Sequence, residues 1–538
     1  CYIIAEKILE YNEDIAKDWE LEGTSGYEFL TFTNRLLTNS RGAKKIEDYY
    51  KKLIPDLKPY KEIVFENKYN FLLSQMGGEL DNLLHYLADL HLLSGSIEIS
   101  ELKESLAVFM ACFPVYRIYP LALPLDEEAL EKVNEAFEKA EKKLENKNGL
   151  DFIRTLFDPA EKAECKLKFV RRLMQFTGPL AAKGVEDTTF YVYNPLISHN
   201  EVGDSPETLS ISIEEFHQKM VSRQKNNPFS LNATSTHDTK RGEDARMRLN
   251  VLSEIAVVWF EKLKQWNQIN KTKFSRIDGK QAPSLNDTYF IYQSLLGSFP
   301  ENYEADSTFI ERSEAFITKA LREAKVESNY TEPNEVYESA CKNFIRNILT
   351  SSKFLTSFIP FLQVVQERAN IYSTIQSAIK ILAPGIPDIY QGSELLEISY
   401  VDPDNRRPVD YEFRQKLLEN IIQKEKEGKE ALKQFLEENK NKGALKLFIT
   451  WKTLWLRRIH PDLFTVGEYV PLDTNGAEGH WLAFMRKYQE KCVIVTIPVC
   501  STPDHQISLS LSDYCPGTFT NIFTGTQLHA KEIQAVLK

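Results

Sequence analysis

The stretch Asn232-Ala-Thr-Ser-Thr-His-Asp-Thr-Lys-Arg-Gly-Glu-Asp244 carries the strongest fold signal in the chain. It begins with small and β-branched residues, which favour a short buried strand. Ionisable side chains follow at once, among them His237, Asp238, Lys240 and Arg241. A strand that ends directly in charged residues is typical of the carboxyl end of a barrel strand that carries chemistry. The alternative is an ordinary helix that begins after the strand with a capping residue.

Several stretches resemble one protein family. Residues 234–241 (TSTHDTKR) resemble the fourth signature region of the α-amylase superfamily, in the form found in maltooligosyl trehalose synthases. Residues 5–9 (AEKIL), 23–29 (GTSGYEF), 183–188 (KGVEDT) and 384–410 (PGIPDIYQGSE, running on to VDPDNRRPVD) are similar to other stretches of that family. The resemblance implies an α/β fold built on a (β/α)8 TIM barrel. This chain would form the second half of it, strands five to eight, with large helical insertions and a C-terminal antiparallel β domain.

The first candidate for catalysis is Glu6, which interrupts the apolar run of residues 2–9. A continuous apolar run predicts a buried parallel strand. Burial raises the pKa of a carboxyl group, which suits a general acid near neutral pH. The alternative is a structural ion pair between Glu6 and Lys7 or another neighbour. In the resembled family this position holds the general acid/base.

The resemblance also assigns roles to the residues that follow the strand near residue 232. Asp238 would form hydrogen bonds to the ring hydroxyls of a sugar, and these bonds would strengthen as an oxocarbenium-like state develops. His237 would donate to a hydroxyl of the same sugar. Lys240 and Arg241 would bind sugar or orient carboxylates.

A second group of candidates lies at residues 183–194. Lys183 and Glu186 are expected on a loop and short helix, and the resemblance implies that they bind hydroxyls of the reducing-end sugar. The alternative is a salt-bridged surface turn that includes Asp187.

The loop after the predicted eighth strand holds the remaining candidates: Tyr390, Asp404 and Arg407. The resembled family uses this region to shape the substrate site. The alternative is that its Asp and Arg residues only brace each other, because ion pairs commonly have such a structural role.

The resemblance implies an isomerase that carries out intramolecular transglycosylation. Such an enzyme converts the reducing-end α-1,4 linkage of a maltooligosaccharide into an α,α-1,1 (trehalose) linkage by a retaining mechanism. Retention requires a nucleophilic carboxylate about 5–5.5 Å from the acid/base. Two other hypotheses remain open: an amylase-like α-glucan hydrolase or glucanotransferase, and a catalytically silent glucan-binding fragment.

The expected nucleophile is missing from the sequence. No Arg-x-Asp-His stretch occurs, and only five residues precede Glu6. We therefore expect the N-terminal half of the barrel to come from another segment, of the same or a separate chain. The chain alone is expected to be inactive.

Composition limits the other function classes. The 538 residues are 42% hydrophobic, which allows more than one domain. A net charge of −11 disfavours a nucleic-acid partner, and no apolar run of transmembrane length is present. The seven cysteines show no metal-ligand spacing, and their odd number argues against a full disulfide set, which favours the cytoplasm. No phosphate loop is visible, so we expect neither cofactor nor metal.

The predicted domains are residues 1–425, 426–463 and 464–538. The first is the half-barrel, with helical insertions at about 40–105, 126–175 and 245–350; the second is a set of connecting helices; the third is the β domain. Within the barrel, the apolar run 108–116 (VFMACFPVY) is the candidate for strand six and residues 385–392 for strand eight. Four short alternating runs predict the strands of the β domain, at residues 481–485, 492–497, 506–511 and 518–523.

Overall fold

The computed structural model describes residues 1–16, 19–93, 97–159, 161–475, 480–502, 506–509, 517–529 and 534–536. The chain forms two compact units. Unit 1 consists of Cys1–Pro55, Asn194–Lys319 and Asn334–Lys538, and unit 2 of Asp56–Tyr193 and Ala320–Pro333.

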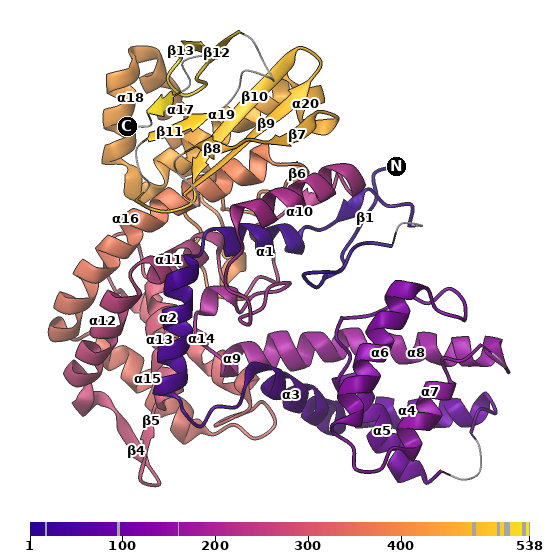
Figure 1. The fold of residues 1–538 in the computed structure, drawn as a ribbon. Coiled ribbons are helices and arrows are strands. Elements are labelled where there is room, and N and C mark those ends of the chain that lie inside the picture. Colours follow the sequence, from indigo (N-terminus) through magenta and orange to yellow (C-terminus); the bar gives the residue numbers. More distant parts are fainter. Residues whose placement is uncertain are drawn as a thin grey trace. The chain divides into compact units, whose positions relative to one another are not determined.

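Unit 1 contains two pairs of short parallel strands, and Figure 1 labels one strand of each pair, β1 and β6. β1 (Ile4–Ala5) pairs with β2 (Gly23–Thr24), and β3 (Leu231–Asn232) pairs with β6 (Ile386–Pro387). Ser230 joins the two pairs, because its hydroxyl accepts from the backbone N–H of Thr24 at 3.0 Å and its carbonyl accepts from that of Ile386 at 2.9 Å. The expected half-barrel as such stays a prediction.

The glycines of the 23–29 stretch allow its backbone to lie directly against β3. A Cβ atom on Gly23 would lie 2.0 Å from the Ser230 hydroxyl, and one on Gly26 would lie 2.1 Å from the carbonyl oxygen of Leu231. Gly26 also has a φ of +94°, which side chains rarely adopt. The stretch therefore supplies a strand and the start of a helix rather than only a loop.

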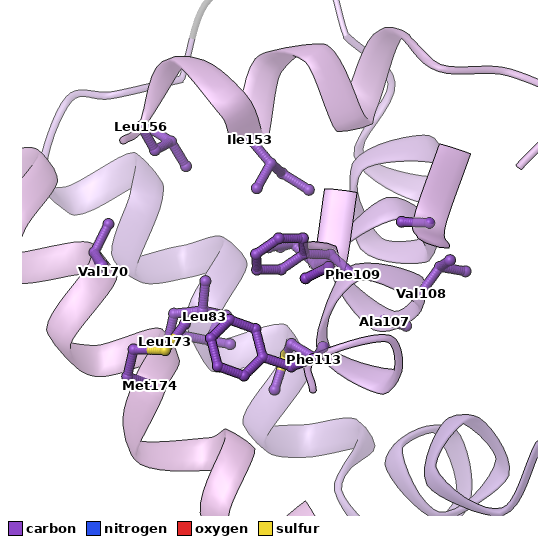
Figure 2. Close-up of a cluster of buried hydrophobic side chains, with 14 of the residues drawn as sticks. Leu83, Ala107, Val108, Phe109, Phe113, Ile153, Leu156, Val170, Leu173 and Met174 are labelled. Carbon is purple, nitrogen blue, oxygen red and sulfur yellow. The ribbon is translucent and has the colours of Figure 1, made fainter. Parts of the chain in front are cut away.

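Residues 108–116 are not a strand, and that prediction was wrong. Its first four residues, 108–111, are the end of helix α5 (Ile99–Ala111) of unit 2, and its other five lie in the turn that follows; β2 is the strand that pairs with β1. Figure 2 shows Val108, Phe109 and Phe113 inside a cluster of apolar side chains from several helices. The helix is buried on every side near its end, so its sequence has no polar face and looks like a buried strand.

Helices make up the rest of unit 2, with the apolar cluster of Figure 2 as their core. They are α3 (Tyr60–Gln75), α4 (Gly77–Asp89), α5, α6 (Glu127–Glu141), α7 (Asn148–Thr155), α8 (Ala163–Ala181), the π-helix η1 (Ala182–Thr189) and α9 (Phe190–Val192).

Helices also surround the parallel strands of unit 1. They are α1 (Tyr27–Leu36), α2 (Ser40–Leu53), α10 (Ile213–Asn226), α11 (Glu243–Glu254), α12 (Ala256–Ile269), α13 (Leu285–Ser298), α14 (Ser307–Ala324, which runs on into unit 2), α15 (Glu335–Leu349), α16 (Ser352–Leu382), α17 (Tyr411–Glu427), α18 (Lys429–Glu438), α19 (Ala444–Ile459) and α20 (Pro461–Thr465). Single turns of 3-10 helix lie at η2 (Ile197–His199), η3 (Lys271–Lys273), η4 (Asp404–Arg406) and η5 (Lys440–Lys442), and a small hairpin joins β4 (Ser275–Ile277) to β5 (Lys280–Ala282). Within the described part of the chain, no single helix has the length and apolar character to cross a membrane; α15 and α16 reach both only as a pair bent by 77°.

The C-terminal part of unit 1 is an antiparallel β region, as predicted. β7 (Glu468–Pro471), β9 (Trp481–Tyr488) and β10 (Lys491–Pro498) form one sheet in the order β10-β9-β7. A second sheet contains β8 (Thr474–Asn475), β11 (Gln506–Leu509) and β14 (Gln534–Val536), and β12 (Thr518–Thr520) pairs with β13 (Gln527–His529). Residues 510–511 of the predicted third strand lie outside the described residues.

Candidate active site

The loop that follows β3, residues 233–242 (the β3 loop), is held in shape by two threonines. The Thr239 hydroxyl donates to the carbonyl of Thr236 at 2.9 Å and accepts from its N–H at 3.3 Å. The Thr236 hydroxyl in turn accepts from the N–H of Asp238 at 3.1 Å. This local bonding buries Thr239 and leaves the side chains of His237 and Asp238 48% and 56% exposed.

The β3 loop brings His237 and Asp238 to Glu6, which directly follows β1. One side-chain nitrogen or oxygen from each of the three residues lies within 4.8 Å of the other two. His237 Nε2 lies 3.4 Å from Asp238 Oδ2. The predicted acid/base and the two predicted sugar-binding residues therefore meet, although more than two hundred positions separate them in sequence. Exposed acidic groups commonly gather without an ion, so this cluster carries no metal assignment.

The environment of Glu6 differs from the expected one. Glu6 is exposed rather than buried, because β1 ends one residue before it. Its neighbour Lys7 is buried and forms an ion pair with Glu13. The Glu6 carboxyl group is thus open to a ligand from solvent.

A buried ionic network lies where the β3 loop enters α11. Lys446 Nζ lies 2.7 Å from carboxylate oxygens of both Glu243 and Asp244, and Lys380 Nζ lies 3.1 Å from Glu243. Burial alone would raise the pKa of Glu243, but Lys380 and Lys446 outweigh it and hold the pKa far below its usual value. Glu243 and Asp244, the last two residues of the stretch 232–244, therefore have a structural role: they fix the first turn of α11.

Glu397 was not singled out by the sequence, although it supports the same loop. Its carboxylate accepts from the Ser235 hydroxyl at 3.3 Å and from the N–H of Glu243 at 3.1 Å, at the amino end of α11. Burial raises the pKa of Glu397, the hydrogen bonds from Ser399 oppose the rise, and the charges of Asp244 and Glu243 add to it. The spacing of Glu397 in the sequence gives no signal, because its partners lie about 150 residues away.

Lys240 and Arg241 are buried, unlike the exposed cluster beside them. The N–H of Lys240 donates to the buried carboxylate of Glu201 at 2.6 Å, and Arg241 Nη1 lies 2.9 Å from the carbonyl of Asn200 and 4.0 Å from Glu201. Both side chains line a small pocket together with Tyr400. Arg241 thus lies beside a buried carboxylate, whereas the contact described for Lys240 comes from its backbone; the roles expected for the two side chains stay predictions.

The candidates that follow β6 brace one another. Asp404 accepts two hydrogen bonds from Arg312, at 2.6 and 2.7 Å, and one from the N–H of Tyr400 at 2.8 Å. Arg407 Nε lies 3.1 Å from Asp404. The Tyr390 hydroxyl donates to a backbone carbonyl in the same loop at 3.3 Å. The contacts of Asp404 therefore agree with the alternative that the Asp and Arg residues of this loop brace each other.

Lys183 and Glu186 lie in unit 2, on the π-helix η1. The hydroxyls of Thr188 and Thr189 each donate to the carbonyl five residues earlier, at 2.8 Å, which matches the wide i to i+5 turn. Lys183 Nζ lies 2.6 Å from Asp187, and the buried Glu186 accepts from the Tyr116 hydroxyl. The ion pair expected for a simple salt-bridged turn is thus present.

No family model matches the chain. A protein of Mycobacterium tuberculosis (strain CDC 1551 / Oshkosh) named as a maltooligosyl trehalose synthase is 27% identical over 489 residues, which are 90% of this chain and 57% of the relative. The chain therefore spans little more than half the length of the curated relatives that it matches.

Solved structures agree with this relative. The maltooligosyltrehalose synthase of Arthrobacter ramosus matches with a TM-score of 0.81 and 26% identity, over 98% of this chain and 64% of that one. A hypothetical maltooligosyl trehalose synthase of Sulfolobus tokodaii matches with a TM-score of 0.76 and 29% identity, over 98% of this chain and 63% of that one. In sequence and in fold, the chain is thus similar to the maltooligosyl trehalose synthases, and these homologues support that family.

Proposed function

We propose that the chain provides the acid/base side of the active site of a trehalose-forming isomerase. The enzyme would convert the reducing-end α-1,4 linkage of a maltooligosaccharide into an α,α-1,1 linkage with retention. The observation that carries the proposal is the meeting of Glu6, His237 and Asp238 at the ends of two different parallel strands. Relatives that bear the name of this enzyme support the choice of reaction.

Glu6 is proposed to transfer the proton in both half-reactions. As an acid it protonates the glycosidic oxygen while a nucleophilic carboxylate attacks the anomeric carbon, so the α-1,4 bond breaks and a glycosyl-enzyme forms. The released glucose then turns, and Glu6 takes the proton from its anomeric hydroxyl as that oxygen displaces the carboxylate. No water is consumed, because substrate and product are isomers.

Asp238 and His237 are proposed to hold the glucosyl unit that reacts. A carboxylate that accepts hydrogen bonds from ring hydroxyls stabilises the positive charge of an oxocarbenium-like state. Both side chains are exposed beside Glu6, so a single sugar ring can contact all three residues.

The remaining assignments belong to the same proposal. Lys183 and Glu186 would bind the reducing-end sugar, Lys240 and Arg241 would orient carboxylates, and Tyr390 would contact sugar at the rim. Asp404 and Arg407 would shape the loop that carries Tyr390. The nucleophile, and the strands that complete a (β/α)8 barrel, would come from a segment outside this sequence.

Product analysis tests the proposal. The chain is expressed as printed and within the full coding region that contains it, and each protein is incubated with maltopentaose. With the protein from the full coding region we expect loss of reducing ends without release of glucose, and a product of unchanged mass; with the chain as printed we expect no turnover. Glu6→Gln should lower the rate about 100-fold or more. Glu20→Gln, an exposed acid between β1 and β2, serves as the matched control.

Other products identify the competing functions. Release of glucose or maltose would show a hydrolase, and longer reducing glucans would show a glucanotransferase. Binding of maltopentaose without turnover in either protein would leave a glucan-binding role and refute the isomerase.

A further inference from the structure

A single side chain connects the loop after β6 to the backbone of the candidate active site. Asn405 lies on η4 and is 8% exposed. Its Nδ2 atom donates to the carbonyl of His237 at 3.0 Å and, more weakly, to that of Thr236 at 3.4 Å. Within the described part of the chain, this is the side-chain hydrogen bond that reaches the His237 carbonyl.

Asn405 is itself held firmly. Its own carbonyl accepts from the Tyr390 hydroxyl at 3.3 Å. The preceding residue, Asp404, is fixed by its two hydrogen bonds from Arg312, and Lys319 Nζ donates to the carbonyl of Asp402 at 2.6 Å. The backbone that carries Asn405 is therefore held by two side chains of α14, Arg312 and Lys319.

The other contacts that the rest of the chain makes with the β3 loop lie on either side of the His237–Asp238 peptide. Thr236 and Thr239 bond to each other, and the Tyr27 hydroxyl lies 3.2 Å from the Thr236 hydroxyl. Further along, the N–H of Gly242 donates to the carbonyl of Ser399 at 3.0 Å. Between these contacts lies the peptide that joins His237 to Asp238. Its N–H donates to the Thr236 hydroxyl within the loop at 3.1 Å, and the side chains on both sides of it are exposed.

We propose that Asn405 is a positioning residue that fixes the His237–Asp238 peptide, and through it the direction in which both side chains face Glu6. The inference rests on the proposed function of these three residues. An asparagine suits the task because one amide nitrogen carries two N–H groups and can serve two successive carbonyls. An aspartate of the same shape would place carboxylate oxygens against those carbonyl oxygens and repel them.

Asn405→Asp tests the proposal, with Asn302→Asp as the control that makes the same charge change at an exposed position. The first measurement is hydrogen exchange of the peptide covering residues 234–240, without substrate. We expect faster exchange in Asn405→Asp only, because the loop opens more often when its clamp is lost. The second measurement is turnover of maltopentaose by the protein from the full coding region: kcat should fall about 10- to 100-fold, since small displacements of catalytic groups have effects of this size. KM should stay within about threefold, because the substrate contacts themselves remain.

Each result decides a separate claim. Unchanged exchange in residues 234–240 would show that Asn405 does not clamp the loop, and faster exchange with unchanged kcat would show that the clamp does not position the site. If the wild-type protein makes no trehalose-type product, the proposed function fails and the positioning role fails with it, while exchange still reports on the clamp. If Asn405→Asp does not fold, Asn405→Ser, which keeps one donor, replaces it and should give intermediate exchange.

Discussion

Replacing Arg223 by methionine should destabilise unit 1 severely, because this one side chain connects α1, β3 and the segment just before β6. Arg223 lies on α10 and is 6% exposed. Its guanidinium donates to Glu28 at 2.6 Å, to the carbonyl of Leu231 at 2.6 Å, and to the side chain of Asn232 at 3.0 and 3.2 Å. A further contact, at 3.3 Å, reaches the carbonyl of Pro384 just before β6.

The expected loss of stability follows from the buried Glu28 carboxylate, which Arg223→Met leaves without its cation. Glu28 is 9% exposed. One of its carboxylate oxygens also accepts from the Thr24 hydroxyl at 2.6 Å, and the other has no hydrogen-bond partner among the described residues. Removing the cation from a buried pair typically costs about 3–5 kcal/mol, most of it from the uncompensated charge. We therefore expect Arg223→Met to lower the free energy of unfolding by about that amount.

Urea unfolding followed by circular dichroism measures this loss, with the exposed Arg41→Met as the matched control. Adding Glu28→Gln to Arg223→Met should recover about 1–3 kcal/mol, because it removes the stranded charge. A loss below about 1 kcal/mol for Arg223→Met, or a double variant less stable than the single one, would refute the reasoning.

Two further predictions concern local environments. Burial lowers the pKa of His217 to about 4, so this side chain stays neutral in the folded protein while the unfolded chain binds a proton below its ordinary pKa of about 6.5. Stability is thus lost as the pH falls from about 6.5 to about 4, by about 3 kcal/mol, and His217→Gln should flatten that part of a plot of unfolding free energy against pH; an unchanged slope would contradict the burial argument. Gly26→Ala should cost about 2–4 kcal/mol, because of its φ of +94° and the approach to Leu231, whereas Gly77→Ala, with open space around it, should cost almost nothing in the same unfolding assay. Equal effects of the two alanines would show that the close approach at Gly26 relaxes easily.

The sequence predicted the parts of the molecule that local patterns encode. The switch to charged residues within 232–244 indicated a strand end, and the structure has one there; β3 covers only Leu231–Asn232, however, so residues 233–236, which were expected in the strand, belong to the loop. Alternation and turn residues predicted the C-terminal antiparallel region for the same reason, because each strand carries its own period of two.

The errors arose where tertiary packing, and not local pattern, decides the outcome. Residues 108–111 of the predicted strand are the end of a helix surrounded by apolar neighbours, which removes the polar face that normally marks a helix. Glu6 is exposed because its strand ends after only two residues, a length that no sequence period can indicate. Glu397 and Asn405 act on the β3 loop from more than 150 positions away, so only the folded chain shows their contacts.

The shortness of the parallel strands affects how precisely the side chains of the candidate active site are positioned. Strands of two residues share few ladder hydrogen bonds, so side-chain hydrogen bonds supplement them. The Ser230 hydroxyl bonds to β2, and the Asn232 side chain bonds to residues of α10 and α16. Asn232 donates to the carbonyl of Lys380 at 3.0 Å while it accepts from Arg223. A one-residue slip of β3 would break these specific bonds all at once, whereas a long ladder could re-form in the shifted alignment. Polar side chains thus fix the register of these strands. The register decides where each loop begins, and therefore whether the acidic groups of the site can meet.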